Sequence, residues 1–124
     1  MINAIIIDDE IKARSALLNI LKRNCEDVLV VAEAEGVLLG LEAINHHNPD
    51  IVFLDIVMPQ KNGIEVLKEI KSILPQLPVV MMSGYSLQEQ KDEAVRLGAV
   101  GCLKKPFEVE DIRRVIKQVI GRDV

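Results

Sequence analysis

The sequence predicts an α/β fold: a doubly wound, five-stranded parallel sheet with helices on both faces. Short apolar runs alternate five times with longer segments of helical periodicity along the 124 residues. The runs are apolar throughout, which is typical of strands buried on both sides, and right-handed helical crossovers leave few other arrangements. No repeat or flexible linker interrupts the alternation, so we expect one domain over residues 1–124.

The first two strand and helix pairs follow from apolar runs and the residues that end them. Residues 4–7 form a run that stops at three acidic residues, and leucines within 17–21 mark the apolar side of the next helix. Residues 28–32 form a second strand. Apolar positions within 37–44 then recur at helical spacing until Asn48-Pro49 ends that helix.

The third pair contains the run around which the chain is organised. Four apolar residues, 51–54, lead to Asp55, and Pro59 prevents further strand pairing four residues later. This pattern predicts a buried central strand with a carboxylate at its carboxyl end. Asn62-Gly63 then turns the chain, and apolar positions within 66–74 indicate an amphipathic helix.

The last two pairs complete the alternation. Residues 79–82 repeat the buried-strand pattern, and residues 100–103 form a short fifth strand. The helix between them has few apolar anchors within 88–93, so we expect it to be the least stable helix. The final helix carries apolar residues within 112–120 and is capped by Gly121.

Composition excludes several classes of protein. The chain is 49% hydrophobic and 27% charged, and no apolar run approaches the roughly 18 residues of a membrane span. A net charge of −4 provides no basic face, so we expect no direct nucleic-acid binding by this chain. Met1 leads into the first strand without a secretory signal, and the two cysteines lack disulfide or metal spacing. We therefore expect a cytoplasmic protein with free thiols and no membrane insertion.

Five charged or hydroxyl-bearing residues stand where the predicted strands end, namely Asp8, Asp9, Asp55, Ser83 and Lys105. Sheets of this kind bind ligands at their carboxyl edge, so we expect these side chains to converge. Buried carboxylates need partners, and three of them close together repel one another unless a cation binds. An all-oxygen site with room for water suits magnesium, which is the metal that we expect.

The same residues predict chemistry as well as binding. A carboxylate such as that of Asp55 can act as a nucleophile that accepts phosphate. Lys105 and Ser83 would supply hydrogen-bond donors to the oxygens of a transferred phosphoryl group, as in an acyl phosphate.

Several separated motifs resemble the receiver domains of two-component response regulators over essentially the full chain. The matching positions share residue type, order and strand position: Asp8-Asp9, Asp55, Met58-Pro59, Gly63, Ser83-Gly84 and Lys105-Pro106-Phe107. The resemblance implies a flavodoxin-like fold with strand order 2-1-3-4-5. It also implies a cis bond between Lys105 and Pro106, since cis bonds are common only before proline.

The resemblance also assigns a role to each residue of the site. Asp55 would be the phosphoacceptor, and Asp9 and Asp55 would bind magnesium directly. Asp8 would help, often through water, and Val57 would contribute its backbone carbonyl. Ser83 would grip the phosphoryl group, and Lys105 would pair with it.

The partners and output are also implied by the family. The phosphoryl group would come from a histidine kinase, a phosphotransfer protein or a small acyl phosphate. Phosphorylation would switch the face around the fourth and fifth helices toward an effector domain or a downstream protein. Apart from self-phosphorylation and self-dephosphorylation, no enzymatic turnover is expected.

The sequence departs from the family pattern at positions that influence switching and lifetime. Cys102 stands where receivers usually carry an aromatic switch residue, so we expect the signal to depend more on backbone shifts. Val57 and Tyr85 occupy the two positions that guard the path of the hydrolytic water. Val57 offers that water no hydrogen bond and Tyr85 adds bulk over the site, so we expect a long-lived phosphorylated form.

Two other functions fit the predicted fold. A flavodoxin-like cofactor module would hold a flavin phosphate at the same edge, but three acids after the first strand would repel an anion unless magnesium intervened. A haloacid-dehalogenase-like phosphatase also uses an aspartate nucleophile and magnesium. That family places the nucleophile on the first strand in a DxD arrangement, whereas the first strand here leads to Asp8-Asp9-Glu10-Ile11.

Overall fold

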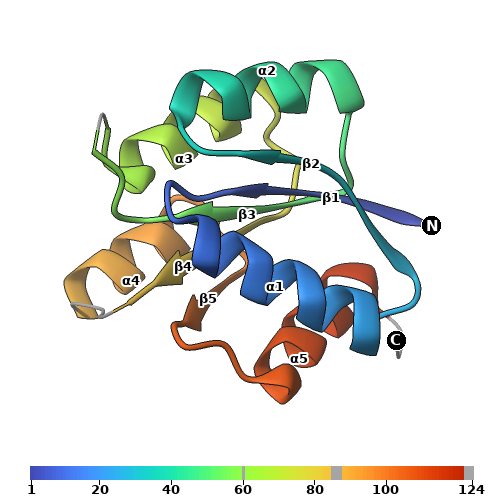
Figure 1. Cartoon of the computed structure of the whole chain (residues 1–124). Helices are drawn as coiled ribbons and strands as arrows, with labels where there is room; N and C mark the ends of the chain where they lie inside the picture. The colour runs from blue at the N-terminus through green and yellow to red at the C-terminus, as the bar shows by residue number, and fades with distance from the viewer. Residues whose placement is uncertain (60, 85–87, 122–124) are drawn as a thin grey trace.

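A computed structural model describes residues 1–59, 61–84 and 88–121 of the chain. Its sheet has five parallel strands in the order β2-β1-β3-β4-β5, which confirms the predicted fold (Figure 1). The strands are β1 (Ile2–Ile7), β2 (Val28–Ala34), β3 (Ile51–Asp55), β4 (Val79–Ser83) and β5 (Gly101–Lys104). The helices are α1 (Ile11–Asn24), α2 (Val37–His47), α3 (Gly63–Ile73), α4 (Gln88–Arg96) and α5 (Val109–Ile120).

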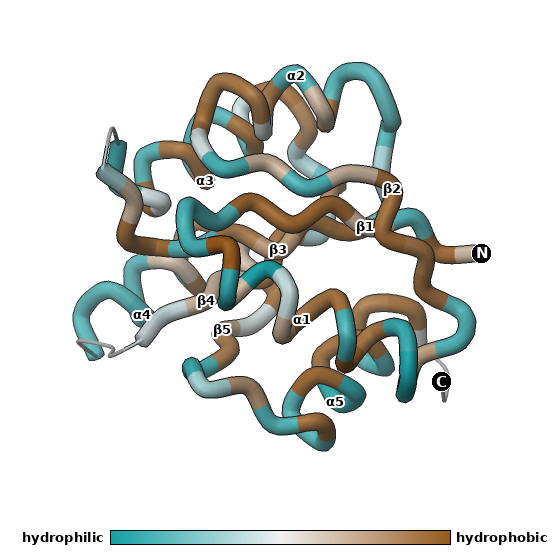
Figure 2. Tube along the Cα trace, viewed as in Figure 1, coloured by the Kyte–Doolittle hydropathy of each residue, from teal (hydrophilic) through white to brown (hydrophobic). Residues whose placement is uncertain are grey.

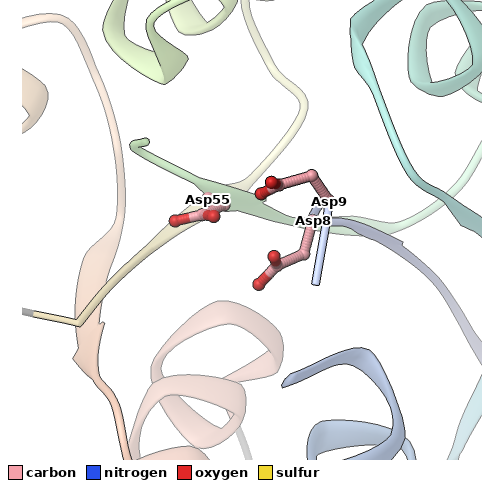
Figure 3. A group of neighbouring side chains, drawn as sticks. All are labelled: Asp8, Asp9 and Asp55. Carbon is pink, nitrogen blue, oxygen red and sulfur yellow. The ribbon is translucent and has the colours of Figure 1, made fainter. Parts of the chain in front are cut away.

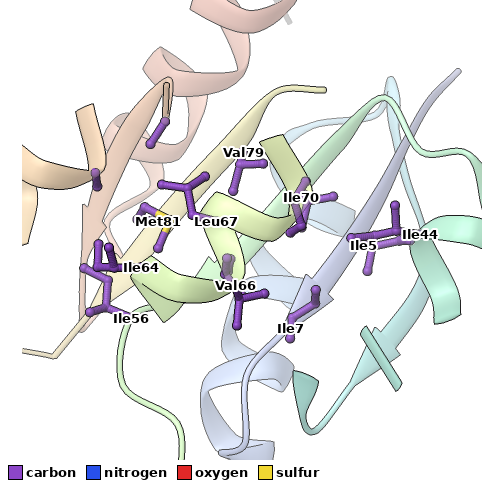
Figure 4. Close-up of a cluster of buried hydrophobic side chains, with 14 of the residues drawn as sticks. Ile5, Ile7, Ile44, Ile56, Ile64, Val66, Leu67, Ile70, Val79 and Met81 are labelled. Atoms are coloured by element: carbon purple, nitrogen blue, oxygen red, sulfur yellow. The ribbon is translucent and has the colours of Figure 1, made fainter. Parts of the chain in front are cut away.

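Two hydrophobic clusters hold the helices on opposite faces of the sheet. Side chains alternate between the two faces along a strand, so Ile5 and Ile7 of β1 join one cluster and Ile6 joins the other. The first cluster, drawn in Figure 4, contains residues of α2, α3 and α4, and the second contains residues of α1 and α5. In Figure 2, β1 is mainly brown in the middle of the fold, and the helices alternate between brown and teal along their length.

Local sequence explains how individual helices begin and end. Asn62 precedes α3, and its side-chain oxygen accepts a hydrogen bond from the backbone N–H of Ile64 at 2.7 Å. At the other end of the chain, Gly121 follows α5 with φ of 71°, a left-handed conformation that glycine adopts without steric cost.

Some boundaries differ from those predicted. β2 continues to Ala34 because Glu33 and Ala34 pair with β1 opposite Ile6 and Ile7, so backbone pairing outlasts the apolar run. β5 begins one residue later than predicted and extends to Lys104, which pairs with Ser83 at the end of β4.

Helix α4 contributes little to the hydrophobic core. Within the described part of α4, the buried side chain is that of Ala94, while Val95 is exposed. This small contribution to the core is in keeping with the predicted weakness of α4, which stays a prediction.

Both cysteines are free, with Cys25 buried and Cys102 partly exposed. Among residues 1–59, 61–84 and 88–121, no helix has the length and apolar character needed to cross a bilayer.

Candidate functional site

Three carboxylates meet at the carboxyl edge of the sheet, where β1 and β3 lie side by side. Asp8 and Asp9 directly follow β1, and Asp55 is the last residue of β3. One oxygen from each lies within 4.8 Å of the others. Figure 3 shows the three side chains grouped at this edge. Asp8 and Asp55 are buried, whereas Asp9 is exposed. The parallel strands therefore bring together carboxylates that are almost fifty residues apart in the sequence.

Lys105 brings the balancing positive charge to this cluster. Its ammonium nitrogen lies 2.7 Å from Oδ2 of Asp8 and 3.4 Å from Oδ2 of Asp55, and the lysine side chain is only 13% exposed. It also donates a hydrogen bond to Oε1 of Glu10 at 3.2 Å. The cis bond between Lys105 and Pro106 that the resemblance implied is present.

Burial and neighbouring charge perturb both titratable groups at the centre of the site. Burial, followed by the negative charge of Asp8, raises the pKa of Asp55 to about 6, although Lys105 and the N–H of Val57 oppose the shift. Burial alone would lower the pKa of Lys105, but the interactions with Asp8, Asp55 and Glu10 outweigh it and raise that pKa. Both shifts arise because Asp8, Asp55 and Lys105 approach one another closely in a buried site.

The other two residues expected at the site flank Asp55. Ser83 ends β4 and is buried; the preceding residue, Met82, pairs with Asp55 across the sheet. The backbone N–H of Lys105 donates to the carbonyl of Ser83 at 2.8 Å, which ties the ends of β4 and β5 together. The backbone N–H of Val57 donates to Oδ1 of Asp55 at 3.3 Å, and the Val57 side chain is 62% exposed.

A cavity of about 420 Å³ opens above these groups. It is lined by Asp9, Glu10, Asp55, Val57, Gly84 and Lys105. The site fits a magnesium ion in its donor chemistry, because the clustered ligands are all carboxylate oxygens and two of them are buried with a net negative charge. The adjacent lysine suits an anionic group beside the metal.

Sequence reasoning missed two residues that organise the site. Glu10 pairs with Lys105, although it had appeared only as the third acid after the first strand. Arg14 lies one turn into α1, where its Nη1 donates to the backbone carbonyl of Asp8 at 2.7 Å and its Nε lies 3.4 Å from Oε1 of Glu33. A charged residue one turn after an acidic loop was the available signal, but the same pattern is common on exposed helix surfaces.

Gly63 is placed by steric necessity beside the same strand end. A Cβ at this position would lie 2.2 Å from the backbone oxygen of Asp55, and the N–H of Gly63 donates to the carbonyl of Ile56 at 2.6 Å. The turn before α3 thus packs directly on the backbone that carries Asp55, which explains why this position holds glycine.

The sheet and its acidic, lysine-paired edge define a signalling receiver with an aspartate cluster. The chain belongs to the response regulator receiver domain family, whose family model matches residues 4–117. It is 35% identical over 117 residues to chemotaxis protein CheY of Bacillus subtilis, an alignment that covers 94% of this chain and 96% of that protein.

Solved structures agree with this membership. The response regulator domain of Thermotoga maritima CheB is 30% identical with a TM-score of 0.87, covering 100% of this chain and 99% of that chain. A chain of the CheX-CheY-BeF3-Mg²⁺ complex from Borrelia burgdorferi is 25% identical with a TM-score of 0.88, covering 96% of this chain and 89% of that one. The protein is therefore a receiver domain of two-component signalling, like the chemotaxis regulators.

The comparisons give no support to the two alternative functions. The family match is to receivers rather than to flavodoxins or phosphatases. Asp8 and Asp9 are adjacent after β1, which is not the DxD arrangement of a dehalogenase-like phosphatase.

Proposed function

We propose that residues 1–124 form one receiver domain in which Asp55 accepts a phosphoryl group. The observation that carries this proposal is the position of Asp55: its buried carboxylate faces Asp8 and Asp9 on one side and lies 3.4 Å from the ammonium of Lys105. A nucleophilic carboxylate with both a cation-binding cluster and a fixed positive charge beside it is suited to receive a phosphoryl group.

Magnesium would be held by Asp8, Asp9 and Asp55 together with the backbone carbonyl of Val57. When bound there, the ion supplies positive charge that offsets the clustered carboxylates and the incoming phosphoryl oxygens. Support comes from the oxygen-only donor set and from the burial of two of its three carboxylates.

The transfer itself is carried by the side chains at the strand ends. A carboxylate oxygen of Asp55 forms a bond to phosphorus while the bond from phosphorus to the donor breaks, and the departing group takes that electron pair. From a phosphohistidine the departing imidazole gains a proton from solvent, and from acetyl phosphate the departing group is acetate. Lys105 and the hydroxyl of Ser83 would donate hydrogen bonds to the phosphoryl oxygens.

The proposed partners are a histidine kinase or a phosphotransfer protein as donor, and an effector domain or downstream protein as receiver of the signal. The complex from Borrelia burgdorferi, in which a CheY is combined with CheX, BeF3 and Mg²⁺, supports both the metal and a protein partner by analogy. We place the domain in the cytoplasm and propose that its chemistry is limited to its own phosphorylation and dephosphorylation. The face formed by α4, β5 and α5 would transmit the change.

Incubation with acetyl phosphate and magnesium, followed by intact-mass measurement, tests the assignment. The unmodified protein should gain one phosphoryl group, and Asp55→Asn should gain none. Glu65→Gln, which removes an exposed acid from the first turn of α3, is the matched control and should label normally. Labelling that persists in Asp55→Asn, or that EDTA leaves unchanged, would contradict the proposal.

A further inference from the structure

Glu10 is held in place by the site although the resemblance gives it no role. It stands immediately before α1, and its backbone N–H donates to Oδ1 of Asp8 at 2.9 Å. Its side chain is 64% exposed but reaches inward to the ammonium of Lys105 at 3.2 Å. The backbone of Glu10 is thus fixed by one member of the acidic cluster, while its carboxylate engages the lysine.

The ammonium of Lys105 lies closer to the segment after β1 than to Asp55. Its distances are 2.7 Å to Asp8, 3.2 Å to Glu10 and 3.4 Å to Asp55. A lysine has three N–H donors, so a donor that Glu10 engages is not free for an oxygen of a group on Asp55. Glu10 also lines the cavity in which that group would lie, and its charge has the same sign as a phosphoryl group.

We propose that Glu10 is a positioning residue that holds Lys105 in its resting place and competes with the phosphoryl group for it. This inference rests on the proposed function of Asp55. In this proposal Lys105 exchanges Glu10 for a phosphoryl oxygen, so Glu10 lowers the affinity of the site for a phosphoryl-like anion. Since the Glu10 carboxylate is largely exposed, the effect is modest, about twofold to fivefold.

Beryllofluoride with magnesium provides a probe of anion affinity that needs no phosphodonor. Its dissociation constant, measured by calorimetry, should fall about twofold to fivefold in Glu10→Gln, which keeps an acceptor but loses the charge. Glu10→Asp keeps the charge but is one methylene shorter, so it should hold the lysine less well and give an intermediate value. Glu26→Gln removes the same charge at the exposed turn before β2 and should leave the constant unchanged.

The same substitution made in a Lys105→Met protein separates a role of Glu10 through Lys105 from simple charge repulsion. In Lys105→Met, the further change Glu10→Gln should leave both beryllofluoride affinity and the rate of labelling by acetyl phosphate unchanged. If the gain persists without the lysine, Glu10 acts by repulsion and the positioning role is wrong. The labelling rate can be followed over long incubations, so this comparison can be made even when Lys105→Met binds beryllofluoride weakly.

The outcomes also distinguish this inference from the function on which it rests. Unchanged or weaker beryllofluoride binding in Glu10→Gln, with normal magnesium-dependent labelling of Asp55, overturns the role of Glu10 alone. Absence of both labelling and beryllofluoride binding in the unmodified protein overturns the proposed function and the inference together. Thermal melting of each variant shows whether a change in affinity is accompanied by a loss of folding.

Discussion

Replacement of Gly63 by alanine should destabilise the protein and disturb the phosphorylation site together. The added Cβ would lie 2.2 Å from the backbone oxygen of Asp55 and 2.7 Å from Cα of Ile56. Both are backbone atoms of the segment that carries Asp55, the proposed phosphoacceptor, so the clash is not relieved by turning a flexible side chain. The turn and the end of β3 must instead move apart.

Two opposing contributions decide whether Gly63→Ala raises or lowers the free energy of unfolding. Alanine is favoured over glycine within a helix by about 1 kcal/mol, and Gly63 is the first residue of α3. Overpacking in a well-packed interior costs about 1–3 kcal/mol, and a contact this short with backbone belongs at the upper end of that range. We therefore expect Gly63→Ala to lower the free energy of unfolding by about 1–2 kcal/mol.

Urea denaturation measures this change, and Gly84→Ala is the matched control because a Cβ there meets no atom of the described residues within 4 Å. The control should change stability by less than about 0.5 kcal/mol. Gly63→Ala should also label more slowly with acetyl phosphate, because the displaced segment carries Asp55. A Gly63→Ala protein as stable as the unmodified one, with an unaltered labelling rate, would refute the steric argument.

Two further predictions concern the support of the site and the lifetime of its product. Arg14→Met should lower the free energy of unfolding by about 1–2 kcal/mol, since it removes the hydrogen bond to the carbonyl of Asp8, and should weaken magnesium binding measured by calorimetry. Arg14→Lys should recover only part of both losses, and equal magnesium affinity in all three proteins would refute the link. Val57→Asn should accelerate loss of the phosphoryl group about tenfold to a hundredfold, because an amide can orient the attacking water with a bond worth about 1.5–3 kcal/mol. The protein can be loaded with phosphoramidate, and loss of the phosphoryl group can be followed by mass. A loss no faster than in the unmodified protein would contradict the prediction. The companion position, Tyr85, lies outside the described residues.

The sequence was informative wherever a buried strand ended in a polar residue. Asp55 and Ser83 could be assigned to one edge of the sheet because each closes an uninterrupted apolar run, and parallel strands end at the same edge. The extension of β2 through Glu33 was not predictable in this way. Its pairing with β1 depends on backbone hydrogen bonds, which carry no hydrophobic signature.

The inward-facing charges of the β1–α1 segment were also missed, for a physical reason. Glu10 and Arg14 have the residue types and spacing of an ordinary solvated helix start. Only the three-dimensional structure shows that one reaches Lys105 and the other reaches the carbonyl of Asp8. Cys102 illustrates the same limit: the thiol packs beside the cluster that α4 joins, but its effect on switching stays a prediction.

The balance of charge around Lys105 connects the positions of the strand ends with the chemistry proposed for the site. Among the described residues, the carboxylates of Asp8, Glu10 and Asp55 all lie within 3.4 Å of the ammonium of Lys105. Burial and then the negative charge of Asp8 raise the pKa of Asp55 to about 6, although Lys105 opposes the shift. A carboxyl group with a raised pKa in the folded state favours folding when protonated and loses that contribution as the pH rises through about 6. An ionised Asp55 is therefore kept at a cost to stability. The excess of negative charge suits a divalent cation, and in the proposed reaction Lys105 would turn toward a phosphoryl oxygen. Three carboxylates thus compete for one lysine in the resting site, and a bound divalent cation would relieve the excess of negative charge.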